Sequence, residues 1–279
     1  MARLRVGVLI SGRGSNLQAL IDACADPAYP AQIVLVISSH ATAPGLKIAA
    51  AAGIRSRVIP HLDRHSFAGE AGAILREQQV ELVCLAGFMR LLERSFVETW
   101  RDRMVNIHPS LLPAFRGLHA QRQALAAGVR FSGCTVHFVR PEFDCGPIIG
   151  QAVVSVHPDD DEERLGARIL KVEHLLYPIV VRLIAECRIK VIADKVEIDG
   201  CQVPEIAVLN PQGTPSTSFA PPSSSAIFGE RSLSDEETMA AVDPDLERHR
   251  QGWLGFTRLM KYALGTIIII LIGLAVFTL

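Results

Sequence analysis

The order of apolar and polar residues predicts alternating strands and helices over the first third of the chain. Short runs of aliphatic and β-branched residues are typical of parallel strands that are buried on both faces. The stretches between them carry apolar residues every three or four positions, as a helix with one buried face does. This alternation predicts a mostly parallel, doubly wound α/β sheet with right-handed crossovers. We expect strands at 4–10, 33–39, 56–60 and 80–87, and helices at 17–25, 45–52 and 67–78.

The pattern changes in the second half of the chain. Two apolar runs, 133–139 and 148–156, are joined by a short connection, so we expect antiparallel or mixed edge strands. A long amphipathic helix should follow over 159–186, with an acidic first turn that suits the helix dipole and with Pro178 as a kink or a break. Residues 190–200 predict a closing hairpin. The predicted buried face of the long helix comprises Leu165, Ile169, Val172, Leu176, Ile179 and Leu183.

The composition shifts after Val208, so we place one globular domain at 1–208. The segment 209–240 is rich in Pro, Ser and Thr and predicts a disordered linker. The remainder, 241–279, is an amphipathic lead followed by the uncharged run Tyr262–Leu279, which would span about 27 Å as a helix. Positive charge precedes this run and none follows, so we expect a single C-terminal transmembrane helix that anchors a cytoplasmic domain to the inner membrane.

Overall composition narrows the class of protein only a little. The formal net charge is −1, so no global field favours nucleic acid. The hydrophobic content of 49% is raised by the apolar C-terminal run. None of the six cysteines forms a CxxC pair, which favours reduced thiols in a cytosolic protein. We expect no metal site.

A glycine-rich turn, Ser11–Asn16, lies between the first predicted strand and helix. Backbone N–H groups at the start of a helix bind phosphate well, and glycine allows a ligand to approach closely. The turn is not GxGxxG, so a dinucleotide is not the first expectation. An ordinary tight turn in which Ser15 or Asn16 caps the helix stays open.

The tract NIHPSLLPAFRGLHAQ, residues 106–121, is too rich in proline and glycine for a long helix or a plain strand. It places an amide, Asn106, two residues before an imidazole, His108. A carboxylate in a later loop, Asp144, could favour the cationic form of His108. Together they suit acyl-type transfer, in which the amide and imidazole stabilise a tetrahedral oxyanion and the carboxylate assists proton transfer. A satisfied turn histidine with a capping Asn is the simpler alternative.

Six motifs in order resemble the phosphoribosylglycinamide formyltransferase family of folate-dependent enzymes in purine biosynthesis. They are ISGRGSNLQALID, LAGFMRLL, NIHPSLLPAFRGLHA, GCTVHFV, DCGPIIGQA and EHLLYP, and the resemblance covers about residues 4–208. It implies a sheet of the formyltransferase type and 10-formyltetrahydrofolate as co-substrate. It also implies that the amine of glycinamide ribonucleotide attacks the formyl carbon.

The resemblance implies roles for individual residues. Asn106 and His108 would face the formyl carbon, and Asp144 would tune His108. His119 and His137 would lie nearby. A histidine that the family often has two residues after His119 is Gln121 here, so any role of that histidine is in doubt. The ribonucleotide would be held by Gly14, Ser15, Asn16 and Glu173. The folate would contact Arg64, Met89, Arg90, Leu91 and Leu92, together with Asn106 and the loop Arg140, Pro141, Glu142, Phe143 and Asp144.

Other functions stay open at this point. Formyltetrahydrofolate deformylase shares the Asn-His-Asp set but hydrolyses the formyl group, and methionyl-tRNA formyltransferase shares the SLLP turn. A membrane-tethered binding module without catalysis is a further alternative function. Self-association of the chain as a homodimer also stays open. The C-terminal stretch from about 249 resembles the bacterial aa3-type cytochrome c oxidase subunit IV, which implies an oxidase contact. The chain could be a true fusion or two joined reading frames.

Overall fold

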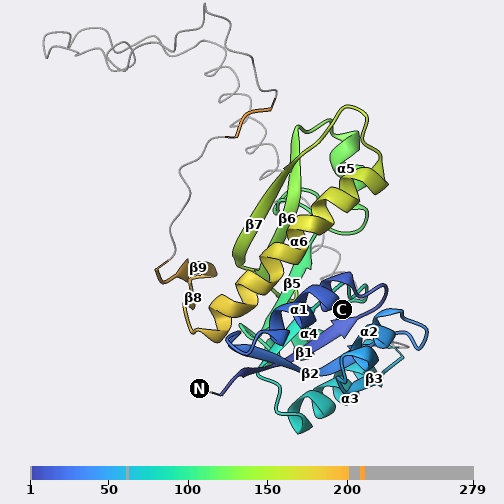
Figure 1. The fold of residues 1–279 in the computed structure, drawn as a ribbon, viewed down its shortest axis with the longest axis vertical. Coiled ribbons are helices and arrows are strands. Elements are labelled where there is room, and N and C mark those ends of the chain that lie inside the picture. The colour runs from blue at the N-terminus through green and yellow to red at the C-terminus, as the bar shows by residue number, and fades with distance from the viewer. Residues whose placement is uncertain (1, 61–62, 201–207, 211–279) are drawn as a thin grey trace, which may run out of the picture. The chain divides into compact units, whose positions relative to one another are not determined.

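A seven-stranded sheet with helices on both faces forms the centre of the computed structural model, which describes residues 2–60, 63–200 and 208–210 (Figure 1). The strand order is β3-β2-β1-β4-β5-β6-β7. Strands β1 to β5 pair in parallel, and β6 and β7 are added antiparallel. The predicted mostly parallel α/β sheet is therefore confirmed. The strands are β1 Leu4–Ile10, β2 Ala31–Ser38, β3 Ser56–Val58, β4 Leu82–Leu85, β5 Met104–His108, β6 Phe131–Phe138 and β7 Ile148–Ser155.

Two hydrophobic clusters cover the two faces of this sheet. Val8 of β1 points into the cluster that packs under α1 and α6, and its neighbour Leu9 points into the cluster under α3 and α4. Both side chains are fully buried, as expected for a parallel strand between two helical layers. The helices are α1 Ser15–Ala25, α2 Gly45–Ala51, α3 Arg64–Glu77, α4 Arg94–Thr99, α5 Ala120–Ala126 and α6 Glu162–Ala185.

Helix α6 crosses the sheet face as one uninterrupted element, so Pro178 does not break it. Its predicted buried face is wrong in part, because Ile179 is 54% exposed while Glu173 and Tyr177 are buried. Inward positions follow steps of four after Ile169, which rotates the buried stripe by one residue relative to the prediction. The Tyr177 hydroxyl donates to carbonyl oxygens of β4 and β5 at 3.0 and 3.2 Å, which ties α6 to the centre of the sheet.

The sequence pattern did not predict β5, and this changes the place of the strand that follows. Asn106 and His108 lie at the end of β5 and not in a turn, because the strand stops only at Pro109. The two predicted strands pair antiparallel, as expected. Since β5 pairs with β6, however, the tract 133–139 is interior, and of these two strands only β7 lies at an edge of the sheet. The expectation of two edge strands is therefore wrong. Short helices α4 and α5 were likewise not predicted.

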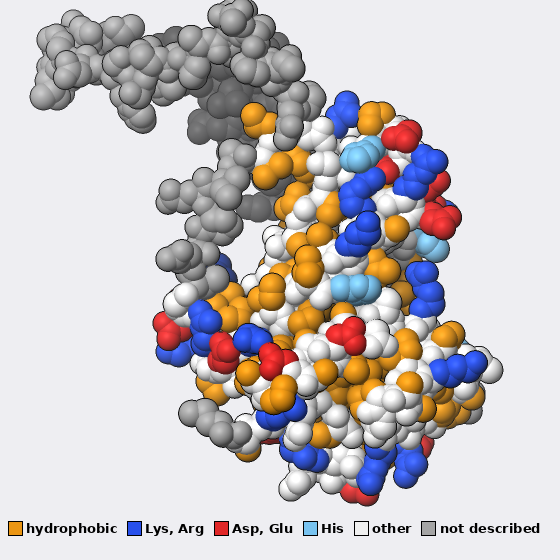
Figure 2. All heavy atoms as spheres, in the orientation of Figure 1, with side chains coloured by type: hydrophobic (Ala, Val, Ile, Leu, Met, Phe, Trp, Pro, Cys, Tyr) orange, Lys and Arg blue, Asp and Glu red, His pale blue; other side chains and the backbone are white. Residues whose placement is uncertain are grey.

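A two-stranded hairpin, β8 Ile189–Ile192 and β9 Lys195–Ile198, follows α6 as predicted. No helix among the described residues is long and apolar enough to cross a membrane. The predicted linker beyond residue 210 and the predicted membrane helix both lie outside the described residues. On the face drawn in Figure 2, acidic and basic side chains are interspersed and do not form single-sign fields, in keeping with the small net charge.

Candidate active site

Three loops meet where the parallel strands β1, β4 and β5 end, and a cleft of about 880 Å³ opens between them. Ligands of open α/β sheets bind outside the carboxyl ends of the strands, so the position is the expected one. Helix α6 supplies the opposite wall. The lining residues are Ser11–Asn16, His40, Ala86, Gly87, Met89, Arg90, Ile107, Pro109, Gln121, Glu162, Glu163, Gly166, Ala167, Leu170 and Glu173.

The structure brings the three predicted catalytic side chains together. His108 Nδ1 lies 3.5 Å from Asp144 Oδ2, and both side chains are 7% exposed. Asn106 Nδ2 lies 3.3 Å from His137 Nε2 on the neighbouring strand β6. The backbone N–H of Gly117 donates to the same Asp144 oxygen at 2.9 Å, which fixes the carboxylate under the turn that follows β5.

Hydrogen-bond partners define the protonation of the two histidines. Carbonyl oxygens can only accept, so His108 Nε2 donates to Phe115 O and His137 Nδ1 donates to Phe138 O, both at 2.9 Å. The Asn106 amide N–H₂ can only donate, so His137 Nε2 accepts from it and the ring is neutral. Burial lowers the pKa of His137 in the same sense. The second Asn106 N–H and the loosely held Nδ1 side of His108 are then the groups that can serve a substrate oxygen.

The glycine-rich turn has the backbone of an anion site. Gly14 has φ 81°, and a Cβ there would lie 2.6 Å from Gly45 Cα, so only glycine fits. Gly14 is itself the N-cap of α1 and no side chain caps the helix. The alternative in which Ser15 or Asn16 caps α1 is therefore wrong, because α1 already begins at Ser15. Its first N–H groups stay free of side-chain caps, and the residues that carry them line the cleft.

Asn16 and Glu173 form a buried pair across the cleft. Asn16 Nδ2 donates to Glu173 Oε2 at 2.8 Å, and the residues are 8% and 6% exposed. Burial raises the pKa of Glu173, and the bond from Asn16 opposes this rise. Asn16 Oδ1 is buried and has no protein partner among the described residues. The Nδ2 side of the Asn16 amide is thus held by Glu173, whereas its Oδ1 has no such bond.

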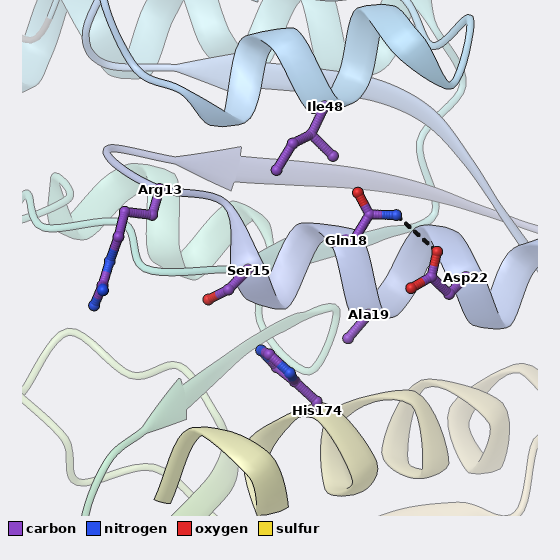
Figure 3. A pocket seen from close by; sticks show the side chains of 7 residues that line it. All are labelled: Arg13, Ser15, Gln18, Ala19, Asp22, Ile48 and His174. Carbon is purple, nitrogen blue, oxygen red and sulfur yellow. Dashed lines mark hydrogen bonds between the residues drawn. The ribbon is translucent and has the colours of Figure 1, made fainter. Parts of the chain in front are cut away.

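A second hollow of about 500 Å³ lies on the outer side of the same turn, where α1, α2 and α6 meet (Figure 3). His174 of α6 points toward α1, and Gln18 donates to Asp22 at 2.7 Å along that helix. Arg13 and Ser15 line both hollows. Burial lowers the pKa of His174, and its Nε2 has no partner within the described part of the chain.

The predicted folate residues fall into separate groups. Met89, Leu91 and Phe143 are exposed apolar side chains, at 68%, 47% and 50%. Leu92 packs against the cluster under α3. Arg64 begins α3 and lines neither hollow.

Two charged side chains of the loop between β6 and β7, Arg140 and Glu142, pair with residues outside the loop, whereas Asp144 of the same loop faces His108. Arg140 donates to Asp102 and Asp194 at 2.7 and 2.9 Å, and Glu142 pairs with Arg94 at 2.9 Å. Pro141 is half-buried between them.

Two features of the cleft are not indicated by any sequence pattern. His40 and Ser39 contact the glycine turn and Arg90, yet their stretch SSHATAP carries no recognisable pattern. The Phe115 carbonyl that orients His108 is a backbone group, which no side-chain motif can signal. Gln121 lines the cleft, whereas His119 is an exposed N-cap of α5.

Comparison with known proteins gives one consistent family. The formyl transferase family model matches residues 4–181. A trifunctional purine biosynthetic protein, adenosine-3, of Drosophila pseudoobscura is 55% identical over 66% of this chain, but the chain spans only 14% of that protein's length. The phosphoribosylglycinamide formyltransferase of Escherichia coli is 41% identical over 72% of this chain and 96% of its own.

Solved structures of glycinamide ribonucleotide transformylases and of a deformylase have a similar fold. The glycinamide ribonucleotide transformylase 1 of Symbiobacterium toebii has a TM-score of 0.69 at 46% identity, covering 70% of this chain and 94% of its own. A formyltetrahydrofolate deformylase of Pseudomonas syringae has a TM-score of 0.67 at 28% identity, covering 70% and 66%.

Proposed function

The chain belongs to the formyl transferase family, and we propose that it transfers the formyl group of 10-formyltetrahydrofolate to the amine of glycinamide ribonucleotide. The observation that carries the proposal is the meeting of Asn106, His108 and Asp144 beside a cleft that is also lined by the uncapped glycine-rich turn at the start of α1. A transferase needs a site for the acceptor as well as for the formyl donor. The likeness to E. coli phosphoribosylglycinamide formyltransferase over nearly its whole length supports the same assignment.

The site residues would act on the tetrahedral intermediate. The substrate amine attacks the formyl carbon, and the carbonyl oxygen becomes an oxyanion. Asn106 Nδ2–H and His108 Nδ1–H donate to this oxygen, and each such donor contributes about 10²- to 10³-fold. This role requires His108 to carry a proton on both ring nitrogens during the reaction, and Asp144 Oδ2, 3.5 Å from Nδ1, would stabilise that cation. The bond from carbon to N10 of the folate then breaks, N10 takes a proton, and the attacking nitrogen loses one.

The ribonucleotide would lie along the turn and α6. Backbone N–H groups from Gly14 to Asn16 would hold its phosphate at the start of α1. Glu173 would contact the acceptor end of the molecule, with Asn16 holding it from behind. Glu173 lines the cleft and receives one hydrogen bond from a neutral amide. A buried carboxylate with so little compensation is costly, which supports a further bond from a polar ligand group.

The folate would occupy the side of the cleft formed by the loops after β4 and β6. Exposed Met89, Leu91 and Phe143 could pack on its rings, and the backbone of 140–144 could read the pterin. Arg64, Arg90 and Leu92 complete the proposed set. Arg90 lines the cleft, whereas Arg64 lies at the start of α3 and lines neither hollow.

The C-terminal segment extends the proposal to a location. We place the catalytic domain at 1–208, the linker at 209–240 and a membrane-anchored segment at 241–279. The 18 uncharged residues after Lys261 support an inner-membrane anchor with the enzyme in the cytoplasm. Contact with a cytochrome oxidase and self-association as a homodimer rest on resemblance alone.

Product analysis tests the acceptor. The protein is incubated with 10-formyltetrahydrofolate labelled with ¹³C in the formyl group, together with glycinamide ribonucleotide. We expect the label in formylglycinamide ribonucleotide by mass spectrometry. Label that appears only in free formate would favour the deformylase, which is the second candidate because one such structure shares the fold at 28% identity.

A further inference from the structure

Four side chains on the cleft wall form a continuous chain of hydrogen bonds that ends at the glycine-rich turn. Arg90 Nη2 lies 2.8 Å from His40 Nε2, and His40 Nδ1 lies 2.9 Å from Ser39 Oγ. Ser39 Oγ lies 2.8 Å from Ser11 Oγ, which also accepts the backbone N–H of Met89 at 3.0 Å. This hydrogen-bond chain therefore joins the loop after β4 to the turn after β1.

The direction of this chain follows from its first member. A guanidinium has donors only, so His40 Nε2 must accept from Arg90 and carries no proton. The neutral ring then carries its proton on Nδ1 and donates to Ser39 Oγ. Ser39 is 5% exposed, and its Oγ contacts only His40 and Ser11 among the described residues. The arrangement that leaves no buried O–H without an acceptor is therefore the one in which the Ser39 O–H donates to Ser11. Every bond in the chain points from Arg90 toward Ser11.

With this direction, the hydrogen of the Ser11 hydroxyl has no acceptor among the described residues. Ser11 Oγ accepts from Ser39 and from Met89, which occupies both of its lone pairs. Its own O–H must therefore donate elsewhere, and no hydrogen bond from it to any described residue is found. Ser11 lines the cleft beside the open turn of Gly12–Asn16.

We propose that the Ser11 hydroxyl donates a hydrogen bond to an oxygen of a phosphate bound on this turn. Ser39 and His40 are positioning residues that keep the Ser11 O–H oriented toward this ligand. The proposal rests on the proposed function, since it concerns the phosphate of the same acceptor. A hydroxyl that is free to rotate could accept or donate. Here both acceptor positions are filled, so the site selects a ligand group that accepts, as a phosphate monoester does.

The uniform direction of these hydrogen bonds should strengthen the Ser11 O–H as a donor. Linked hydrogen bonds that point in one direction polarise one another, and a guanidinium stands at the far end. A hydrogen bond to a charged group has about twice the effect of a neutral one. We therefore expect loss of the Ser11 donor to weaken binding of a phosphorylated ligand by about 10- to 100-fold.

Calorimetric titration of the full chain in detergent tests the proposal with two ligands, glycinamide ribonucleotide and the matching nucleoside without phosphate. Ser11→Ala should raise Kd for the ribonucleotide about 10- to 100-fold and leave Kd for the nucleoside unchanged. His40→Leu should resemble Ser11→Ala. His40→Gln should restore wild-type binding, because its amide oxygen can accept from Arg90 while its N–H₂ donates to Ser39.

Two results would overturn the proposal. One is ribonucleotide binding by Ser11→Ala that equals wild type, and the other is an equal loss with ribonucleotide and nucleoside, which would mean that the hydroxyl only ties two loops together. Inorganic phosphate provides a separate arm, in which Ser11→Ala should also bind more weakly. Failure of the wild type to bind the ribonucleotide would refute the proposed function, and the phosphate arm would still decide the role of Ser11.

Discussion

Replacing His108 with alanine removes the one side chain of the site that touches both the catalytic carboxylate and the turn after β5. The ring lies 3.5 Å from Asp144 and donates to the Phe115 carbonyl at 2.9 Å. In the proposed reaction its Nδ1–H stabilises the oxyanion and passes the proton. Acid–base catalysis by one group contributes about 10²- to 10⁴-fold. The expected loss in kcat is therefore of that order, or about 3 to 5 kcal/mol of the barrier.

The cost in stability should be smaller than the cost in rate. His108→Ala removes one hydrogen bond to a carbonyl and leaves the Asp144 carboxylate with its Gly117 partner, a loss of about 1 to 3 kcal/mol. Domains of this kind unfold with about 5 to 15 kcal/mol, so the variant should stay folded.

The assay follows tetrahydrofolate release at saturating substrates, with a thermal unfolding curve for each protein. His157→Ala is the matched control, because this histidine lies between β7 and α6 and lines neither hollow. We expect the control to keep wild-type kcat. A folded His108→Ala protein with wild-type kcat would refute the catalytic assignment.

Three further predictions concern other parts of the chain. Gly14→Ala should destabilise the protein by at least about 2 kcal/mol and abolish activity, whereas Gly12→Ala, with no atom near its Cβ, should be tolerated in a denaturant titration. Burial raises the pKa of Glu173 above its ordinary 4.5, so its contribution to stability is present at low pH and lost as pH rises through the raised pKa. Glu173→Gln should therefore melt at increasingly higher temperature than wild type as pH rises from about 4 to about 8, and a difference that is flat with pH would contradict this. A protein that ends at Val208 should be soluble and active while the full chain fractionates with membranes, and a misfolded short form or a full chain soluble without detergent would contradict that boundary.

The central sheet could be predicted from the sequence because its strands are buried on both faces. A continuous apolar run as short as Leu4–Ile10 is typical of a buried strand when amphipathic helices alternate with it along the chain. Strand β5 could not be predicted in the same way, since the polar Asn106 and His108 interrupt its apolar pattern. These polar side chains belong to the candidate site, and their polarity removes the continuous apolar run that predicts a buried strand.

The site could be predicted as a set of residues but not as a geometry. Motif order indicated Asn106, His108 and Asp144, and the structure brings them together. The hydrogen bond from Asn16 to Glu173 could not be predicted, because it joins residues 157 positions apart. The same holds for His40, whose importance depends on a hydrogen-bond direction that only the folded arrangement defines.

The measurement that tests the account most directly is the rate of formyl loss from 10-formyltetrahydrofolate with and without glycinamide ribonucleotide. The glycine-rich turn that lines the same cleft is proposed to hold the phosphate of the acceptor. We predict that formyl loss is slow when the folate is alone and becomes fast when the ribonucleotide is added. Equally fast loss in its absence would contradict the account and identify the chain as a hydrolase.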